Sequence, residues 1–186
     1  PKEMGQNMTA NQIYESGKTI AGELTKIGIN LNLAPVADLA SDQNPSYAMR
    51  CLGSDADGVA DLLDDFVSGM REGGLSVTLK TFPGIGNVSA DVTESIAENT
   101  DSLMTIRDTN FVPYASGIQA GADCVMVSNA AYSKLTVKKV PAFMSQDIVT
   151  KLLREELGFD GIVMTSPLND NVIENNYTNE FADRKS

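Results

Sequence analysis

Apolar residues recur along this chain in two alternating patterns. Over residues 11–27 they have the spacing of an amphipathic helix, and over residues 29–33 they alternate with polar residues as in a strand. The same two patterns return three more times, and glycines follow the helical segments at 28, 73–74 and 158. The further helices are expected over residues 55–72, 107–120 and 145–157, and the further strands over 75–79, 124–127 and 161–165.

This alternation is typical of βαβ units around a parallel sheet, so the expected fold class is α/β. In such folds the functional side chains follow the carboxyl ends of the strands. Those ends lie at residues 35–38, 80–84, 128–129 and 165–167.

Composition narrows the classes of function. The chain has 186 residues, with 25 acidic against 14 basic side chains and a net charge of −11. That balance argues against a nucleic-acid partner, because phosphate neutralisation needs clustered Lys and Arg. With no His, the chain alone cannot build a Ser-His-Asp triad or a His-ligated metal site. No metal or cofactor is expected.

The cysteines and the apolar runs add little about the compartment. Cys51 and Cys124 form no CxxC motif; we expect two buried thiols, with one disulfide as the alternative. No apolar run approaches the roughly 18 residues that read as a transmembrane helix, so no transmembrane segment is expected. The first residue is not Met, so localisation stays open between cytoplasmic and exported.

Charged residues follow the first two predicted strands. Asp38 could accept two sugar hydroxyls and Arg50 could donate to a sugar, although a salt bridge bracing the loop explains them equally well. Lys80 precedes a loop, residues 81–86, that could either hold it against a ligand or form a tight turn. Asp91, in the next segment, reads by itself as part of a solvated acidic loop.

A second acidic cluster lies within the predicted helix over residues 55–72. Its aspartates fall mostly away from the apolar stripe, which favours a solvated face over a metal site. They are Asp57, Asp61, Asp64 and Asp65.

Five stretches carry a resemblance to a known family. In chain order they are GINLNLAPVAD (28–38), RCLGSD (50–55), KTFPGIG (80–86), PAFMS (141–145) and LLREELGFDG (152–161). Together they resemble glycoside hydrolase family 3, especially its β-N-acetylhexosaminidase branch, which usually has RSFGSD and KHFPGHG at the second and third stretches. The likeness extends over roughly residues 5–173.

The resemblance implies a particular partial fold. The family's catalytic domain is a (β/α)8 TIM-type barrel, and this chain matches about its strands 3–6, as one partial domain over residues 1–186. A full barrel takes about 250 residues, and an open half leaves two unpaired strand edges. We therefore expect the remainder of a longer chain, or a second chain, to complete the barrel.

The resemblance also implies which positions perform catalysis. This branch retains anomeric configuration, with an Asp-His pair in a D-S-H motif as acid/base and the first Asp of T-D-D-L as nucleophile. Here Asp91 is kept, Thr93 stands in place of that His, and Ser166 stands at the nucleophile position. The two His of the glycine loop are replaced by Thr81 and Ile85.

The sugar-binding positions match the family's residues better than the catalytic positions do. Asp38, Arg50 and Lys80 match the family's sugar-binding positions, and Thr81 is expected beside them. A Ser hydroxyl without a base is a poor nucleophile, and a Thr hydroxyl is too weak an acid to protonate a leaving oxygen.

The favoured hypothesis is therefore a catalytically impaired homologue that binds N-acetylglucosamine-containing carbohydrate, such as cell-wall sugars. One alternative is an active retaining O-glycosyl hydrolase of N-acetylglucosaminides with relocated carboxylates, at Asp170 or Glu94. Another is a structural or partner-binding domain. Whether the chain is an enzyme stays open at this point.

Overall fold

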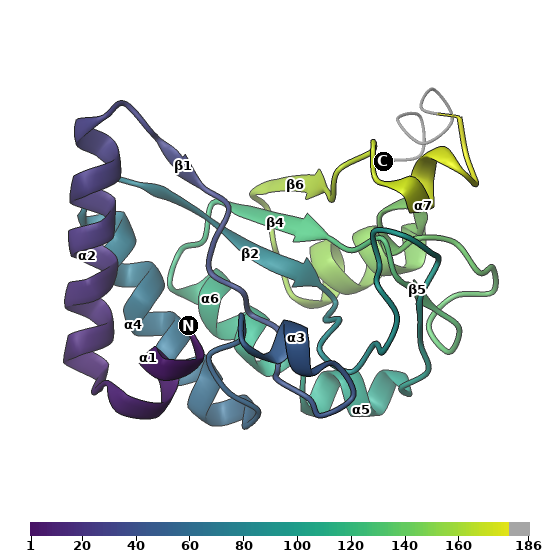
Figure 1. Ribbon diagram of the computed structural model, residues 1–186, viewed down its shortest axis with the longest axis horizontal. Coiled ribbons are helices and arrows are strands. Elements are labelled where there is room, and N and C mark those ends of the chain that lie inside the picture. The colour runs from purple at the N-terminus through teal and green to yellow at the C-terminus, as the bar shows by residue number, and fades with distance from the viewer. Residues whose placement is uncertain (179–186) are drawn as a thin grey trace.

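A parallel sheet of four strands runs through the computed structural model, which describes residues 1–178 (Figure 1). The strand order is β1-β2-β4-β6, and every neighbouring pair is parallel. The strands are β1 (Leu31–Asn32), β2 (Ser76–Phe82), β4 (Cys124–Val127) and β6 (Ile162–Thr165). The predicted α/β fold with a parallel sheet is thus confirmed.

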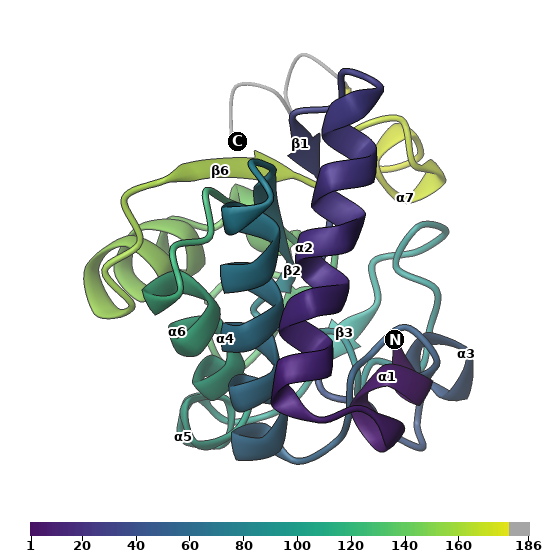
Figure 2. The same ribbon diagram turned by 90° about the vertical axis from the view of Figure 1, so that its left-hand side faces the viewer.

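Long helices pack along one side of this sheet. Figure 2 shows α2 (Ala10–Lys26), α4 (Ala56–Glu72) and α6 (Phe111–Gln119) in a row, with α4 in the middle. A fourth long helix, η2 (Asp147–Glu156), precedes β6. Short helices and a small second sheet fill the connections: α1 (Lys2–Asn7), α3 (Pro45–Ala48), α5 (Leu103–Asp108), η1 (Ala142–Met144), α7 (Asn171–Glu174), and β3 (Glu98–Asn99) paired with β5 (Ala131–Tyr132).

Side-chain caps start the main helices where polar residues precede them. The Thr9 hydroxyl and the Gln12 side chain form a capping box at α2. The Asp55 carboxylate accepts from the Gly58 amide at the start of α4, 2.8 Å away. The Ser145 hydroxyl accepts from the Ile148 amide, 3.4 Å away, although the residue that bounds η2 at its start is Gln146, which has no side-chain cap.

Four predicted elements differ in detail. The helix expected over 107–120 is two helices, α5 and α6, which are separated at Thr109, where φ is −126° and ψ is −80°. The first strand is reduced to two residues, and the second extends to Phe82. The helix before β6 is a π-helix with the same buried face, since an apolar stripe specifies which side is buried better than how tightly the backbone coils.

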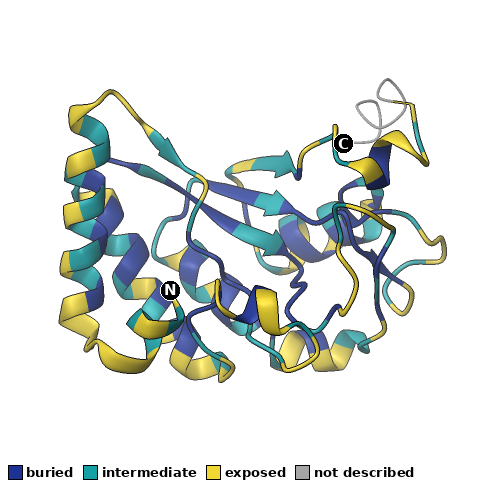
Figure 3. Ribbon diagram, in the orientation of Figure 1, coloured by how far each residue is buried: buried dark blue, intermediate teal, exposed yellow. Residues whose placement is uncertain are grey.

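The sheet is covered unequally. Its central strands are mostly buried, whereas the edge strands β1 and β6 are intermediate or exposed (Figure 3). Leu33 beside β1 is 46% exposed, and Ile162 in β6 is 62% exposed. Within residues 1–178, each of these strands has a neighbour in this sheet on one side alone. The open edges expected of a partial barrel are therefore present.

Two smaller expectations concern the cysteines and membranes. Cys51 and Cys124 are both free and buried, as the favoured prediction had it. Burial raises the pKa of the Cys51 thiol to about 12. Among residues 1–178, no helix combines the length and apolarity needed to cross a bilayer.

Glycines let α2 and α4 approach closely. A Cβ at Gly69 would lie 2.1 Å from the Tyr14 carbonyl oxygen, and one at Gly17 would lie 2.6 Å from that of Phe66. Backbone cannot yield as a flexible side chain does. A larger residue at either glycine must therefore push the two helices apart.

We predict that Gly69→Ala lowers the free energy of unfolding by roughly 1–3 kcal/mol through overpacking. Gly22→Ala is the matched control, since a Cβ at that helical position meets nothing within 4 Å. It should stabilise by up to about 1 kcal/mol, because Ala has the higher helix propensity. Urea unfolding measures both, and equal midpoints for the two variants would contradict the packing argument.

Candidate functional site

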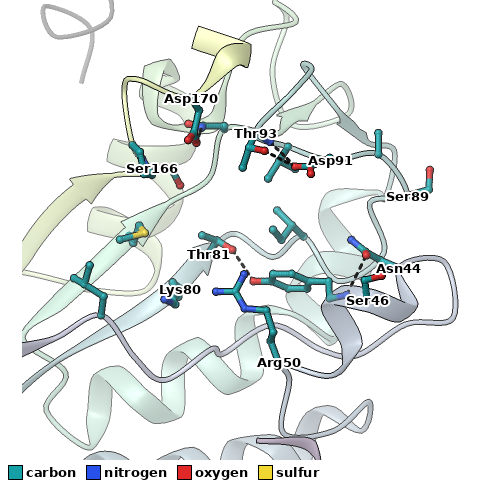
Figure 4. Close-up of a pocket in the computed structure, with 18 residues that line it drawn as sticks. Asn44, Ser46, Arg50, Lys80, Thr81, Ser89, Asp91, Thr93, Ser166 and Asp170 are labelled. Atoms are coloured by element: carbon teal, nitrogen blue, oxygen red, sulfur yellow. Dashed lines mark hydrogen bonds between the residues drawn. The ribbon is translucent and has the colours of Figure 1, made fainter. Parts of the chain in front are cut away.

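A cavity of about 690 Å³ opens at the carboxyl ends of the strands (Figure 4). Its volume falls within the roughly 300–1,000 Å³ range of small-molecule sites. Of the seven site residues predicted from sequence, six line this cavity: Arg50, Lys80, Thr81, Asp91, Thr93 and Ser166. Asp170, the alternative carboxylate, lines it as well.

Asp38 is the exception, because it lies entirely buried and does not line the cavity. One carboxylate oxygen accepts from the Tyr114 hydroxyl at 2.8 Å and from the Thr81 amide at 3.0 Å. The other accepts from the Tyr47 hydroxyl at 2.7 Å and from the Thr81 hydroxyl at 3.0 Å. Burial raises the pKa of Asp38, and these four hydrogen bonds oppose that rise. Its contact with sugar hydroxyls stays a prediction.

The end of β2 is shaped around this carboxylate. The register between β2 and β4 shifts between Lys80 and Phe82, so Thr81 falls at a β-bulge. Both the amide and the hydroxyl of Thr81 donate to Asp38. The peptide bond between Lys80 and Thr81 is cis. The bulge therefore coincides with the point where the strand reaches the cavity.

The glycine loop that follows is held in place by contacts from other elements. The Tyr132 hydroxyl donates to the Gly84 carbonyl at 2.9 Å, and Asn110 donates to the Pro83 carbonyl at 3.1 Å. Gly84 itself has a φ of 119°, which L side chains rarely adopt. The loop is thus a fixed turn that borders the cavity at Thr81 and Ile85.

One wall of the cavity is basic. The Arg50 guanidinium lies over the Tyr47 ring, 5.1 Å from its centroid, and Lys80 is half-buried beside it. Burial lowers the pKa of Lys80, the nearby Arg50 charge lowers it further, and Asp38 opposes both. No salt bridge joins Arg50 to Asp38 in the described part of the chain, so the loop-bracing ion pair weighed above does not form.

The facing wall is acidic. Asp91 accepts from both the amide and the hydroxyl of Thr93, at 2.8 and 2.7 Å, and these bonds lower the pKa of Asp91. Asp170 accepts from Asn129 at 2.9 Å. Burial raises the pKa of Asp170, and the charges of Asp91 and Glu94 raise it further. In Figure 4 Asp91, Thr93 and Asp170 lie across the cavity from Arg50 and Lys80.

Ser166 is tied to the backbone. It is 8% exposed, and its hydroxyl donates to the Val127 carbonyl at 3.0 Å. No carboxylate accepts from this hydroxyl among the hydrogen bonds of the described residues. A hydroxyl held in this way has no base to activate it.

Sequence reasoning missed Tyr47 and Tyr114, which position the floor of the site. Tyr114 falls within the helix expected over residues 107–120, yet its hydroxyl is buried against Asp38. A fully buried Tyr hydroxyl usually needs a hydrogen-bond partner, which is the signal that could have found it. Tyr47 lies in α3, whose start is capped by Asn44 through a 3.2 Å bond to the Tyr47 amide.

Among residues 1–178, no group of three or more acidic or Cys side chains is arranged to hold a metal ion. The aspartates of α4 lie on its outer surface: Asp57, Asp61 and Asp64 are exposed and Asp65 is partly so. The cavity therefore offers hydrogen-bonding and charged groups as its chemistry.

A parallel barrel-like sheet with polar residues at its carboxyl end defines a broad class of enzyme folds. Within that class, residues 1–186 match the family described as "Glycosyl hydrolase family 3 N terminal domain". The chain belongs to glycosyl hydrolase family 3, as the resemblance implied.

Curated relatives and solved structures agree with this assignment. The chain is 34% identical over 155 residues to a beta-hexosaminidase of Xylella fastidiosa (strain M23), covering 83% of this chain and 45% of the relative. It is 35% identical over 149 residues to a beta-hexosaminidase of Stenotrophomonas maltophilia (strain K279a), covering 80% and 44%. The chain thus spans less than half the length of these relatives.

The backbone is similar to those of family 3 enzymes. A glycoside hydrolase family 3 beta-N-acetylglucosaminidase from Paenibacillus sp. superposes with a TM-score of 0.91 at 32% identity, over 95% of this chain and 34% of that one. A beta-N-acetylhexosaminidase from Beutenbergia cavernae superposes at 0.84 with 35% identity, over 93% and 53%. The partial TIM-type barrel is therefore the fold of this chain.

We predict that Tyr114→Phe destabilises the protein by about 1–3 kcal/mol, because it removes a donor from a fully buried carboxylate. Tyr14→Phe is the control: it removes the same atom from a hydroxyl that donates to Glu72 in an exposed setting. That variant should unfold almost as the wild type does. Chemical denaturation compares the two, and similar losses in both would contradict the role given to Asp38.

Proposed function

We propose that this family 3 domain binds N-acetylglucosamine-containing carbohydrate in the strand-end cavity and is impaired in hydrolysis. The observation that carries the proposal is Ser166, whose hydroxyl donates to the Val127 carbonyl at the position where, by resemblance, the family has its nucleophilic Asp. A retaining glycosidase needs a group there that can attack the anomeric carbon.

The position of the acid/base supports the same conclusion. By resemblance Thr93 replaces the His of the acid/base pair, and its hydroxyl is engaged with Asp91 at 2.7 Å. Thr93 keeps the hydrogen bond that a histidine could make, but it has no titratable proton for the leaving oxygen. General acid–base catalysis contributes roughly 10²–10⁴-fold in rate, so this loss alone is severe.

The residues proposed to hold the sugar also support the proposal. Arg50, Lys80 and Thr81 line one cavity, where they offer a guanidinium, an ammonium and a hydroxyl. The buried Asp38 carboxylate holds Thr81 by accepting hydrogen bonds from its amide and its hydroxyl. The N-acetylglucosamine unit is proposed because the similar proteins are named beta-hexosaminidases and a beta-N-acetylglucosaminidase.

One observation favours a second candidate, an active hydrolase with relocated carboxylates. Asp91 and Asp170 share the cavity, and their surroundings shift their pKa values in opposite directions. Such a separation is what an acid and a base in one site require. In this candidate Asp170 is the acid and Asp91 the ionised partner. Glu94 is less suited, because it is exposed and accepts from Asn171 at 2.8 Å.

The unpaired edges support a further part of the proposal. The main sheet of residues 1–178 has four parallel strands, where a closed barrel of this type has eight. Pairing β1 and β6 with additional strands, from a longer chain or a second chain, would satisfy their open backbone groups and cover Leu33 and Ile162.

We predict that the wild-type protein releases no p-nitrophenol from p-nitrophenyl N-acetyl-β-glucosaminide, while N-acetylglucosamine raises its melting temperature. A ligand at about 100 times its Kd adds about 2.7 kcal/mol to stability, which thermal unfolding detects readily.

Two other results would each favour a different function. Turnover that Asp170→Asn abolishes, and that the exposed control Asp64→Asn preserves, would establish the relocated hydrolase instead. An unchanged melting temperature at saturating concentrations of sugar would favour a structural or partner-binding domain.

A further inference from the structure

Tyr47 contacts the site at both ends of its side chain. Its hydroxyl donates to the buried Asp38 carboxylate at 2.7 Å and lies 3.0 Å from the Thr81 hydroxyl. The face of its ring lies against Arg50, whose guanidinium carbon is 5.1 Å from the ring centroid. Tyr47 is 9% exposed, whereas Arg50 is exposed, and both line the cavity. One side chain therefore connects the floor of the cavity to a residue proposed to hold the sugar.

The ring of Tyr47 is held in place by the backbone around it. The Tyr47 amide donates to the Asn44 side chain at 3.2 Å, and Asn44 in turn donates to the Val88 carbonyl at 2.8 Å. The Arg50 amide donates to the Tyr47 carbonyl at 2.8 Å, which fixes the two residues relative to each other. Burial raises the pKa of Tyr47 and the Asp38 charge raises it further, so the hydroxyl keeps its proton and remains a donor.

The Arg50 side chain is restrained far less by other groups. It takes part in none of the salt bridges among residues 1–178, and its guanidinium is instead placed over the Tyr47 ring. A cation in this position is attracted by the ring quadrupole. Immobilising a long side chain when a ligand binds costs affinity, and a side chain that is already ordered avoids much of that cost. The ring should therefore order Arg50 before any ligand arrives.

We propose that Tyr47 is a positioning residue for sugar binding, whose ring holds the Arg50 guanidinium toward the cavity while its hydroxyl fixes the ring to Asp38. This assignment rests on the proposed binding of N-acetylglucosamine and names a residue that acts in it through Arg50. The contacts come from α3, β2 and the loops beside them, and not from the open edge strands β1 and β6.

Two substitutions separate the ring from the hydroxyl. Tyr47→Phe removes the hydroxyl and keeps the ring face, whereas Tyr47→Leu removes both. Each variant should unfold at a lower urea concentration than the wild type, because each takes a donor from the buried Asp38 carboxylate. Tyr47→Phe should nevertheless bind N-acetylglucosamine as the wild type does. Tyr47→Leu should bind it about 2- to 5-fold more weakly in a calorimetric titration, which is the size of an exposed cation–π contact.

A double-mutant cycle assigns this difference to Arg50. When Arg50→Gln is added to both variants, Tyr47→Phe and Tyr47→Leu should bind the sugar equally, because the group that the ring orients is gone. Arg107→Gln is the matched control, since Arg107 is paired with Glu156 at 2.6 Å and does not line the cavity. That control should retain the wild-type affinity and the difference between the two Tyr47 variants.

The order of Arg50 is measured separately in the sugar-free protein, by NMR relaxation of its Nε–H group. We expect an order parameter above about 0.6, the limit of the flexible range, in the wild type and in Tyr47→Phe. Tyr47→Leu should fall below that limit. The wild-type value alone decides the point if Tyr47→Leu does not fold, because a flexible Arg50 would overturn its ordering by the ring.

The outcomes separate this proposal from the function on which it rests. Equal sugar affinities of Tyr47→Phe and Tyr47→Leu, beside a wild type that binds, would overturn the positioning role and leave sugar binding in place. A difference between them that persists with Arg50→Gln would overturn the assignment to Arg50. A wild type that does not bind N-acetylglucosamine would overturn the proposed function, and the role of Tyr47 in it as well.

Discussion

The buried carboxylate of Asp38 is the interaction on which the functional end of this molecule depends. It accepts hydrogen bonds from Tyr47 in α3, Thr81 in β2 and Tyr114 in α6, so one side chain joins three elements. A buried charge is tolerated only when its hydrogen-bonding capacity is filled, which makes each of these donors costly to lose. The floor of the cavity is therefore placed by electrostatics as well as by apolar packing.

The proposed sugar-binding residues and the substituted catalytic positions, which lie above that floor, differ in their hydrogen bonding. Arg50 and Lys80 project into the cavity without an ion-pair partner among the described residues, and so they are available to a ligand. Ser166 and Thr93, by contrast, donate their hydroxyls to neighbouring groups of the chain. This contrast is the physical basis for proposing a domain of glycosyl hydrolase family 3 that retains sugar binding but is impaired in hydrolysis.

The sequence predicted the elements well and their long-range contacts poorly. Apolar periodicity is a local signal, and it located all four strands of the main sheet and the long helices. Asn110, beside the break between α5 and α6, donates to the Pro83 carbonyl 27 positions away, and the carboxylate of Asp38 accepts from Tyr114, 76 positions away. Neither partner is encoded in local spacing. Six of the seven predicted site residues do line one cavity, because the carboxyl ends of parallel strands share one edge of the sheet.

The most direct test of the central claim is to restore the two substituted groups and measure turnover. Ser166→Asp combined with Thr93→His places a nucleophile and an acid/base above an unchanged floor. The account predicts that p-nitrophenyl N-acetyl-β-glucosaminide is hydrolysed at least about 10²-fold faster by this variant than by the wild type. A wild-type protein that already hydrolyses the substrate as fast as the restored variant would contradict it.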